Sequence, residues 1–177
     1  MTTATQSRPT VEQVWGWLGE VPDPEIPAVS VVDLGIVRDV RWQDERGDEL
    51  VVTVTPTYSG CPATSVISFA IEGALRDRGL GNVRLERRMA PAWTTDWITD
   101  RGRERLHAYG IVPPSGRAGG EAPPSLDRLL GHKAPALACP RCGSAHTERV
   151  SEFGSTPCKA QYRCRDCLEP FDYFKCI

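Results

Sequence analysis

Apolar residues recur at helical spacing in two segments of the first half of the chain. In residues 11–20 they fall every three or four positions, which predicts a helix with one apolar face. Thr10 precedes this helix and Gln13 lies three residues further on, the pattern of a capping box at a helix start. Residues 62–79 repeat the helical spacing and end at Gly79, so they predict a second helix.

Three further segments predict strands, and the first two of them are rich in β-branched residues. Residues 29–42 and 49–57 flank a turn-like segment around Gly47, so they predict an antiparallel hairpin. Residues 82–89 predict a third strand. Residues 21–27 contain three prolines, which exclude a helix or a central strand there and predict a stiff, extended loop.

The order α-β-β-α-β predicts a small α+β sandwich with its helices on one face of the sheet. Residues 94–109 predict an additional helix, whereas residues 112–136 are rich in Pro, Gly, Ala and Ser and predict a flexible linker. A cysteine-rich segment follows. The expected limits are therefore 11–111 for the α+β domain, 112–136 for the linker and 137–177 for a carboxy-terminal β module.

The composition fits a globular protein of modest size. The chain has 177 residues, 40% of them apolar and 25% charged, with a formal net charge of −2. This balance provides no basic field for nucleic acid, and no apolar run reaches the length that crosses a membrane. The polar start of the chain does not resemble a signal peptide, so we expect a cytoplasmic, reducing environment. There, paired cysteines indicate metal or redox chemistry before disulfides.

Six of the seven cysteines lie in the last 39 residues. Cys139 and Cys142 form one CxxC pair, Cys164 and Cys167 form another, and 21 residues separate the two pairs. Two facing CxxC turns supply four thiolates in tetrahedral arrangement, the layout of a zinc ribbon. A module this small also buries too little apolar area to fold unaided. We therefore predict a metal site and favour zinc, although four thiolates also accept a rubredoxin-like iron or an iron–sulfur cluster.

Two further thiols of this segment, Cys158 and Cys176, have no assigned place in the pattern. Either could replace a primary ligand, join a reactive pair, bind a second metal or pack near the first one. Packing is the simplest interpretation. His146 could be a ligand, but a surface histidine is the more usual arrangement.

Cys61 stands alone in the first 138 residues, between a predicted strand and a predicted helix. Pro62 suits the first position of that helix, which would place Cys61 at the N-cap, where backbone N–H groups and the helix dipole stabilise a thiolate. Such a thiolate suits metal or cluster transfer, but a small buried cysteine would close the same turn. Asp23 and Glu25 flank Pro24 in the stiff loop and could bind a cation or cap a helix.

The sequence lacks several enzyme signatures. It contains no glycine-rich dinucleotide fingerprint after a strand and no helices with the Glu-x-x-His pairs of a di-iron oxygenase. No serine or cysteine triad is evident. These observations predict a protein that is not itself catalytic.

A series of motifs runs through the chain in order: DPEIP, TPTYSGCPAT, PAWTTDW, RERLHAYGI, CPRC, SEFGST and EPFDYFKCI. The DPEIP and GCP segments resemble the small domain of SufT-type and cytosolic iron–sulfur assembly factors. The whole series, over about residues 11–177, resembles the D-subunit family (PaaD) of the phenylacetyl-CoA epoxidase system.

This resemblance implies an accessory subunit in aerobic phenylacetate degradation, where a di-iron monooxygenase epoxidises the ring of phenylacetyl-CoA. The subunit would mature or repair an iron or iron–sulfur centre of its partners, the oxygenase and the reductase. The resemblance to assembly factors falls on Asp23, Glu25 and Cys61. Cys61 would hold a cluster transiently, with Asp23 or with the Cys61 of a second copy in a homodimer.

Two alternatives remain open at this point. The protein could be a structural subunit whose ribbon docks the partners while Cys61 only closes a turn. It could also be an electron carrier with iron in the four-cysteine site, which metal analysis and visible absorption would distinguish from a colourless zinc protein.

Overall fold

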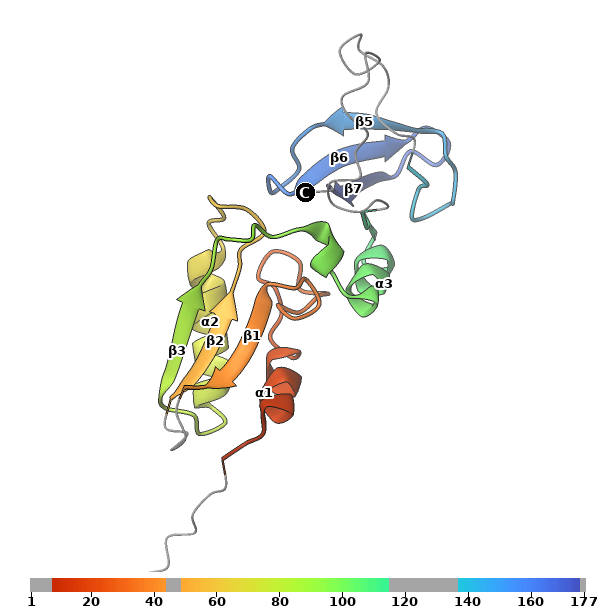
Figure 1. Ribbon diagram of the computed structural model, residues 1–177. Helices are drawn as coiled ribbons and strands as arrows, with labels where there is room; N and C mark the ends of the chain where they lie inside the picture. The colour runs from red at the N-terminus through yellow and green to blue at the C-terminus, as the bar shows by residue number, and fades with distance from the viewer. Residues whose placement is uncertain (1–7, 44–48, 115–136, 176–177) are drawn as a thin grey trace, which may run out of the picture. The chain divides into compact units, whose positions relative to one another are not determined.

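The computed structural model describes residues 8–43, 49–114 and 137–175 (Figure 1). Its contacts divide the chain into two compact units, Met1–Ala92 and Trp93–Ile177. None of the helices in the described ranges is both long enough and apolar enough to span a bilayer.

The first unit contains a three-stranded sheet covered by two helices (Figure 1). The elements are α1 (Val11–Leu18), β1 (Val37–Trp42), β2 (Leu50–Val54), α2 (Thr64–Arg76) and β3 (Val83–Arg87). β2 lies at the centre, antiparallel to β1 and parallel to β3. The predicted order α-β-β-α-β and the predicted α+β class are therefore confirmed.

α1 begins where the sequence predicts. The Thr10 side chain accepts a hydrogen bond from the Gln13 N–H, and the Gln13 side chain accepts one from the Thr10 N–H, which is the reciprocal capping box. α1 packs against β1 and α2, and α2 packs against β3. Their shared core is apolar and includes the fully buried residues Val14, Leu18, Leu50, Val52, Ile71 and Leu75.

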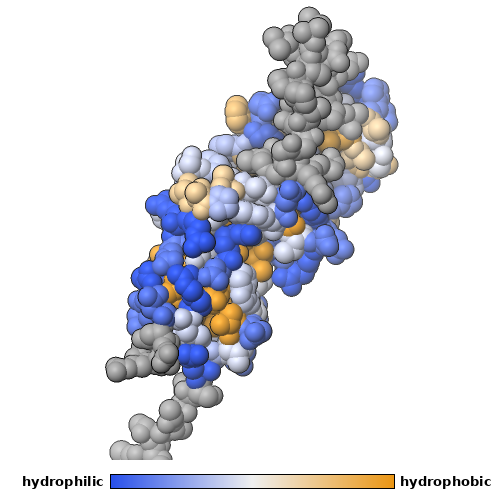
Figure 2. Space-filling view, in the orientation of Figure 1, coloured by the Kyte–Doolittle hydropathy of each residue, from blue (hydrophilic) through white to orange (hydrophobic). Residues whose placement is uncertain are grey.

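A ladder of charged side chains covers the other face of this sheet. Arg41 on β1 binds Asp39 at 2.7 Å and Glu86 on β3 at 2.8 Å, and Arg84 binds Glu86 at 2.5 Å and Glu49 at 3.0 Å. Figure 2 shows hydrophilic residues over much of this view of the unit, with apolar ones between them. The aliphatic stems of long charged side chains can cover apolar surface in this way, which lets β2 be buried on both faces.

The second unit begins with two short helical pieces where one helix was expected over residues 94–109. A 3₁₀ turn, η1 (Thr95–Trp97), is followed by α3 (Asp100–Ala108). The prediction of one continuous helix is wrong because Ile98 is extended and Thr99 starts a new helix, its hydroxyl accepting from the Gly102 N–H at 3.0 Å. Gly110, at φ 92°, ends the segment as expected.

The ribbon sheet has four strands in the order β4-β7-β6-β5. They are β4 (Ile111–Val112), β5 (Thr147–Ser151), β6 (Lys159–Cys164) and β7 (Pro170–Phe174). β4 was not expected. It pairs in parallel with β7, so the segment just after α3 is hydrogen-bonded to the ribbon.

The domain limits 11–111, 112–136 and 137–177 stay a prediction about separately folding parts. The contacts of the chain divide it between Ala92 and Trp93, and they place β4 in the same unit as β7. Most of the predicted linker, residues 115–136, lies outside the described residues.

Candidate metal centre

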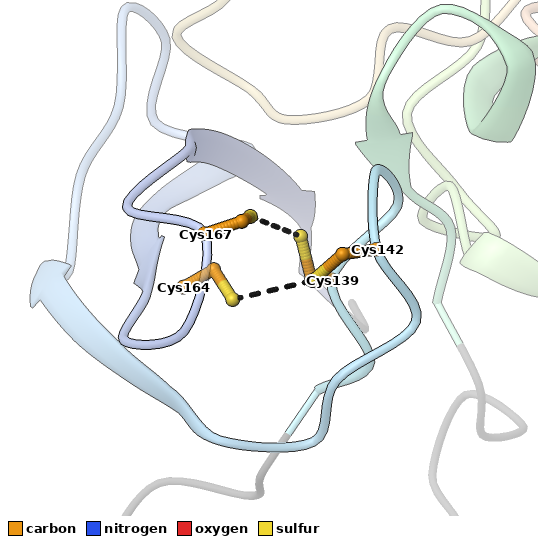
Figure 3. A group of neighbouring side chains, drawn as sticks. All are labelled: Cys139, Cys142, Cys164 and Cys167. Atoms are coloured by element: carbon orange, nitrogen blue, oxygen red, sulfur yellow. Dashed lines mark hydrogen bonds between the residues drawn. The ribbon is translucent and has the colours of Figure 1, made fainter.

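Four cysteines from the two CxxC turns converge at one end of the ribbon (Figure 3). The ligand atoms of Cys139, Cys142, Cys164 and Cys167 all lie within 4.8 Å of one another. The Sγ atoms of Cys139 and Cys167 are 3.7 Å apart, and those of Cys142 and Cys164 are 3.6 Å apart. In each close pair, one sulfur comes from the first CxxC turn and the other from the second, so the two turns face each other.

This geometry fits a tetrahedral metal. A zinc–sulfur bond of about 2.3 Å places the sulfurs of a regular tetrahedron about 3.8 Å apart, close to the two observed separations. Cys139 and Cys164 are buried, whereas Cys142 and Cys167 are exposed. Four protein thiols leave no position for a substrate, which is the pattern of a structural rather than a catalytic site. This set is the only such group of ligands among the described residues.

The two turns have the same construction. In the first, the Gly143 N–H donates to the Cys139 oxygen at 2.9 Å, and Gly143 has a φ of 75°. In the second, Leu168 occupies the corresponding position after Cys167 and has a φ of 65°. A left-handed residue after the second cysteine therefore closes each turn, although only the first turn uses the glycine that this conformation favours.

Polar side chains tie the two turns together beside the thiols. Asp166, between the second pair of cysteines, accepts a short hydrogen bond from the Ser144 hydroxyl. Its other oxygen lies 3.0 Å from Nδ1 of His146. His146 is thus an exposed histidine bound to a carboxylate, as its surface interpretation predicted. Ser144 and Asp166 were not among the residues predicted from the sequence, although an acidic residue inside a CxxC turn is a signal for such a partner.

Hydrogen bonds and proximity shift the thiol pKa values in opposite directions. The backbone N–H of Cys167, followed by that of Asp166, lowers the pKa of Cys164 to about 7. The backbone N–H of Ser144 lowers the pKa of Cys142, but the neighbouring thiols and burial raise it to about 12. Four thiols this close cannot all ionise without a compensating cation, which is what a bound metal supplies.

Of the two remaining ribbon thiols, Cys158 is not part of this set. Cys158 immediately precedes β6, whereas Cys164 ends it, so about six residues of extended strand, roughly 20 Å, separate them. Cys158 is buried, and its Sγ lies 3.0 Å from the Thr156 hydroxyl, which agrees with a packing role away from the metal centre. Cys176 lies outside the described residues.

In the first unit, Asp23 has a local structural partner. Its Oδ1 accepts hydrogen bonds from the N–H groups of Glu25 at 3.0 Å and Ile26 at 2.9 Å, so this buried carboxylate holds the proline-rich loop in its turn. Glu25 itself is exposed. Within the described ranges, Asp23, Glu25 and Cys61 do not form one group of metal ligands.

Cys61 lies in the turn before α2 and is partly exposed. Its expected N-cap position is wrong, because α2 begins at Thr64 with Ala63 as its N-cap. The Cys61 N–H donates to the Tyr58 oxygen at 3.2 Å, and the Cys61 oxygen accepts from the Thr64 hydroxyl at 2.9 Å. Hydrogen bonds therefore hold the backbone of this turn, while the residue itself is partly exposed.

Comparisons with known proteins cover both units. Residues 11–84 match a family described as iron–sulfur cluster assembly protein, and residues 123–175 match the PaaD zinc beta ribbon domain. A relative from Escherichia coli (strain K12), provisionally named as the D component of 1,2-phenylacetyl-CoA epoxidase, is 48% identical over 98% of each chain.

Two solved structures resemble the chain in part. A domain of unknown function, DUF59, from Bacillus anthracis is 27% identical, covers 54% of this chain and 89% of its own, and has a TM-score of 0.49. A conserved hypothetical protein of Thermotoga maritima is 31% identical, covers 56% of this chain and 95% of its own, and has a TM-score of 0.47. The fold described above follows from the topology of the chain and does not depend on these similarities.

The similarity to the E. coli protein extends over both units, and the four ribbon cysteines lie within the segment that matches the PaaD ribbon. The chain therefore belongs to the PaaD family of 1,2-phenylacetyl-CoA epoxidase components, which join an iron–sulfur assembly domain to a zinc ribbon.

Proposed function

We propose that this protein is the accessory subunit that matures or repairs an iron or iron–sulfur centre in the oxygenase or the reductase of a phenylacetyl-CoA epoxidase. Its membership of the PaaD family supports the epoxidase system as its setting. The match of residues 11–84 to an iron–sulfur assembly family is the observation that carries the maturation role.

Cys61 is the side chain that we assign to the transfer step. It is the one cysteine within residues 11–84, and it is partly exposed on a turn that two hydrogen bonds to its backbone hold in place. An iron ion or a cluster is here the cargo, and one thiolate of the subunit would supply a labile ligand that the client protein then replaces.

Asp23 and Glu25 take different parts in this proposal. Asp23 uses one carboxylate oxygen to hold its own loop, so its contribution is to fix the position of the loop. Glu25 is exposed and could supply an oxygen ligand to the cargo, either within one chain or in a homodimer. Substitution of Asp23 should therefore affect folding, whereas substitution of Glu25 should affect transfer alone.

The ribbon metal is proposed to be zinc with a structural role. The four thiols fill a tetrahedral site, so no coordination position stays open even though Cys142 and Cys167 are exposed residues. Metal analysis should give about one zinc per chain in a colourless protein. Iron in this site, with its visible absorption, would instead support an electron carrier.

The decisive experiment compares client metal content. The oxygenase and reductase are produced with the wild-type subunit, with Cys61→Ser, or with Ser59→Ala, which alters the same turn without removing a thiol. We expect Cys61→Ser to leave the subunit folded and zinc-loaded but to yield clients with low iron content and low epoxidase activity. Ser59→Ala should behave as the wild type.

Full metal content in clients produced with Cys61→Ser would contradict the transfer role. Loss of co-purification with the clients when the ribbon cysteines are replaced would then favour a docking role.

A further inference from the structure

β3 is an edge strand of the first unit, and one of its sides faces no other strand among the described residues. The Arg88 N–H, just after β3, donates to the Val54 oxygen of β2 at 2.9 Å. Backbone polar groups point alternately to the two sides of a strand. Val83, Leu85 and Arg87 therefore direct their N–H and C=O groups to the free side, where they are available for another strand.

The sequence of β3 is complementary to itself when read in the antiparallel direction. The strand reads Val83-Arg84-Leu85-Glu86-Arg87. If a second copy pairs with it about a two-fold axis at Leu85, then Arg84 lies opposite Glu86 of the second copy, and Glu86 lies opposite its Arg84. Opposite charges directly across an antiparallel pair are stabilising, whereas like charges are destabilising.

The two neighbouring registers lose this complementarity, and a register about Arg87, which would pair Glu86 with Arg88, places two Arg87 side chains opposite each other. A two-fold axis that keeps each face of the sheet continuous must pass through a residue, because side chains alternate between faces. An axis at Arg84 places two arginines opposite each other, and an axis at Glu86 places two glutamates opposite each other. With the axis at Leu85, the backbone groups of the central residue also face the second copy, which makes it a hydrogen-bonded pair.

Both faces of the sheet next to this edge suit the same contact. On the helix side, an open groove of about 490 Å³ lies between α2 and the sheet. Its lining includes Phe69, which is 73% exposed, and Val66 nearby on α2 is 54% exposed. Glu72 and Arg87 also line the groove, and neither has an ion pair within the described part of the chain. Thr64, Ser65 and Ser68 complete the polar part of the lining, so the groove offers a second copy an exposed phenylalanine, three hydroxyl groups and two opposite charges.

On the other face, Arg84 and Glu86 already belong to the charged ladder across β1, β2 and β3. Pairing about Leu85 extends this ladder into the second copy without burying an unpaired charge. Their side chains are 41% and 30% exposed, so both can reach across the new edge.

We propose that two copies of this protein associate through antiparallel β3 strands about a two-fold axis at Leu85, forming one continuous six-stranded sheet. The occupant of the groove beside β3 is then α2 of the second copy. This assembly is independent of the metal-transfer role of Cys61.

The test is sedimentation velocity of the full chain over a range of concentrations. We expect the wild type to dimerise. Glu86→Arg alone and Arg84→Glu alone place like charges opposite each other, so the dissociation constant of each should rise at least about tenfold. In an equimolar mixture of the two variants, residue 84 of each chain again lies opposite a residue 86 of opposite charge. The mixture should therefore form a heterodimer. Each substitution also alters the ion pairs within its own chain. These intrachain effects are the same in the separate variants and in their mixture, so a difference in dimerisation between these samples reports the contact between chains.

A second pair of variants tests the backbone. Arg87→Pro removes an N–H that points to the free side and should abolish the dimer, whereas Arg87→Ala keeps that N–H and should dimerise more than the proline variant. A wild type that stays monomeric at every concentration would overturn the proposal. So would single charge variants that dimerise as the wild type does, or a mixture that remains monomeric while the wild type dimerises.

Discussion

Leu168 is a leucine in a backbone conformation that favours glycine. It follows the second metal-binding turn with a φ of 65°, and its side chain is 67% exposed, so little burial offsets the strain. Leu168→Gly should raise the free energy of unfolding of the metal-loaded ribbon by about 1 kcal/mol, because a left-handed conformation costs a side-chain-bearing residue about that much. Chemical denaturation with excess metal measures the change.

The first turn provides the matched control. Gly143 has a φ of 75°, and a Cβ placed there would meet nothing within 4 Å. Gly143→Ala should therefore lower the free energy of unfolding by about 1 kcal/mol through backbone strain alone. If Leu168→Gly destabilises the ribbon, then its leucine side chain makes a stabilising contact that outweighs the strain.

The sequence predicts the four metal ligands, but it does not predict the backbone conformation of the residues beside them. Two CxxC pairs identify Cys139, Cys142, Cys164 and Cys167 because the spacing alone lets a turn aim two sulfurs at one point. The conformation of Leu168 has no such local signal. Its φ follows from the equivalence of the two turns, and the sequence shows glycine in only one of them.

At the scale of elements, a buried ion pair fixes the far end of the ribbon. Lys159 begins β6 with a side chain that is 5% exposed, and its Nζ lies 3.4 Å from Oδ2 of Asp172 on β7. A Cβ added at Gly154 would lie 3.2 Å from the other Asp172 oxygen, so the loop before β6 passes close over this pair. The SEFGST motif, which contains Gly154, therefore covers a buried ammonium group.

Asp172→Asn should lower the free energy of unfolding of the second unit by about 3 kcal/mol, because it leaves the ammonium of Lys159 buried without a countercharge. Combining it with Lys159→Met should recover most of the loss. The exposed pair of Arg149 and Glu152 serves as the control, and Glu152→Gln should change the value by less than about 1 kcal/mol. Equal losses for the single and double variants would contradict this explanation.

The charged ladder of the first unit predicts a dependence on pH. Hydrogen bonds from Arg41 and then Arg84 hold the pKa of Glu86 below its ordinary value of 4.5. A lowered pKa in the folded state gives stability that is complete above the unfolded value and is lost as the pH falls through the folded value. Between about pH 5 and pH 3, the wild type should therefore lose more stability than Glu86→Gln.

Denaturant titrations at several pH values measure this difference. Both proteins carry the same ribbon, so the loss of metal in acid affects them equally. Parallel curves for the wild type and Glu86→Gln would show that the ionisation of Glu86 contributes nothing to stability.

Elements with strong periodicity could be predicted from the sequence, whereas the breaks and short connections between elements could not. Both helices of the first unit and its three strands occur in the expected order because the helices carry apolar residues at helical spacing and turn signals separate the strand segments. The expected helix over residues 94–109 fails at Ile98, where burial of an extended residue and capping by Thr99 outweigh helical spacing. β4, only two residues long, has too few residues for any periodicity.

At the scale of the whole molecule, the two units are expected to differ in their need for metal. The ribbon core consists of Leu137, Cys139, Ala160, Tyr162, Cys164 and Phe171, so two of its six buried residues are themselves ligands. The core of the first unit is made of apolar side chains from α1, α2 and the sheet. Free energy from metal binding is therefore built into the folding of the second unit only.

A strong chelator should unfold the ribbon and leave the first unit folded. Hydrogen exchange followed by mass spectrometry resolves the two, because peptides from β5 and β6 should lose protection by at least about a thousandfold while those from β1 and β2 keep it. Cys139→Ser combined with Cys167→Ser should reproduce the result without chelator. Retained protection in β6 after complete metal removal would show that the ribbon folds on its apolar core alone. Loss of protection in β2 would show instead that the two units unfold as one.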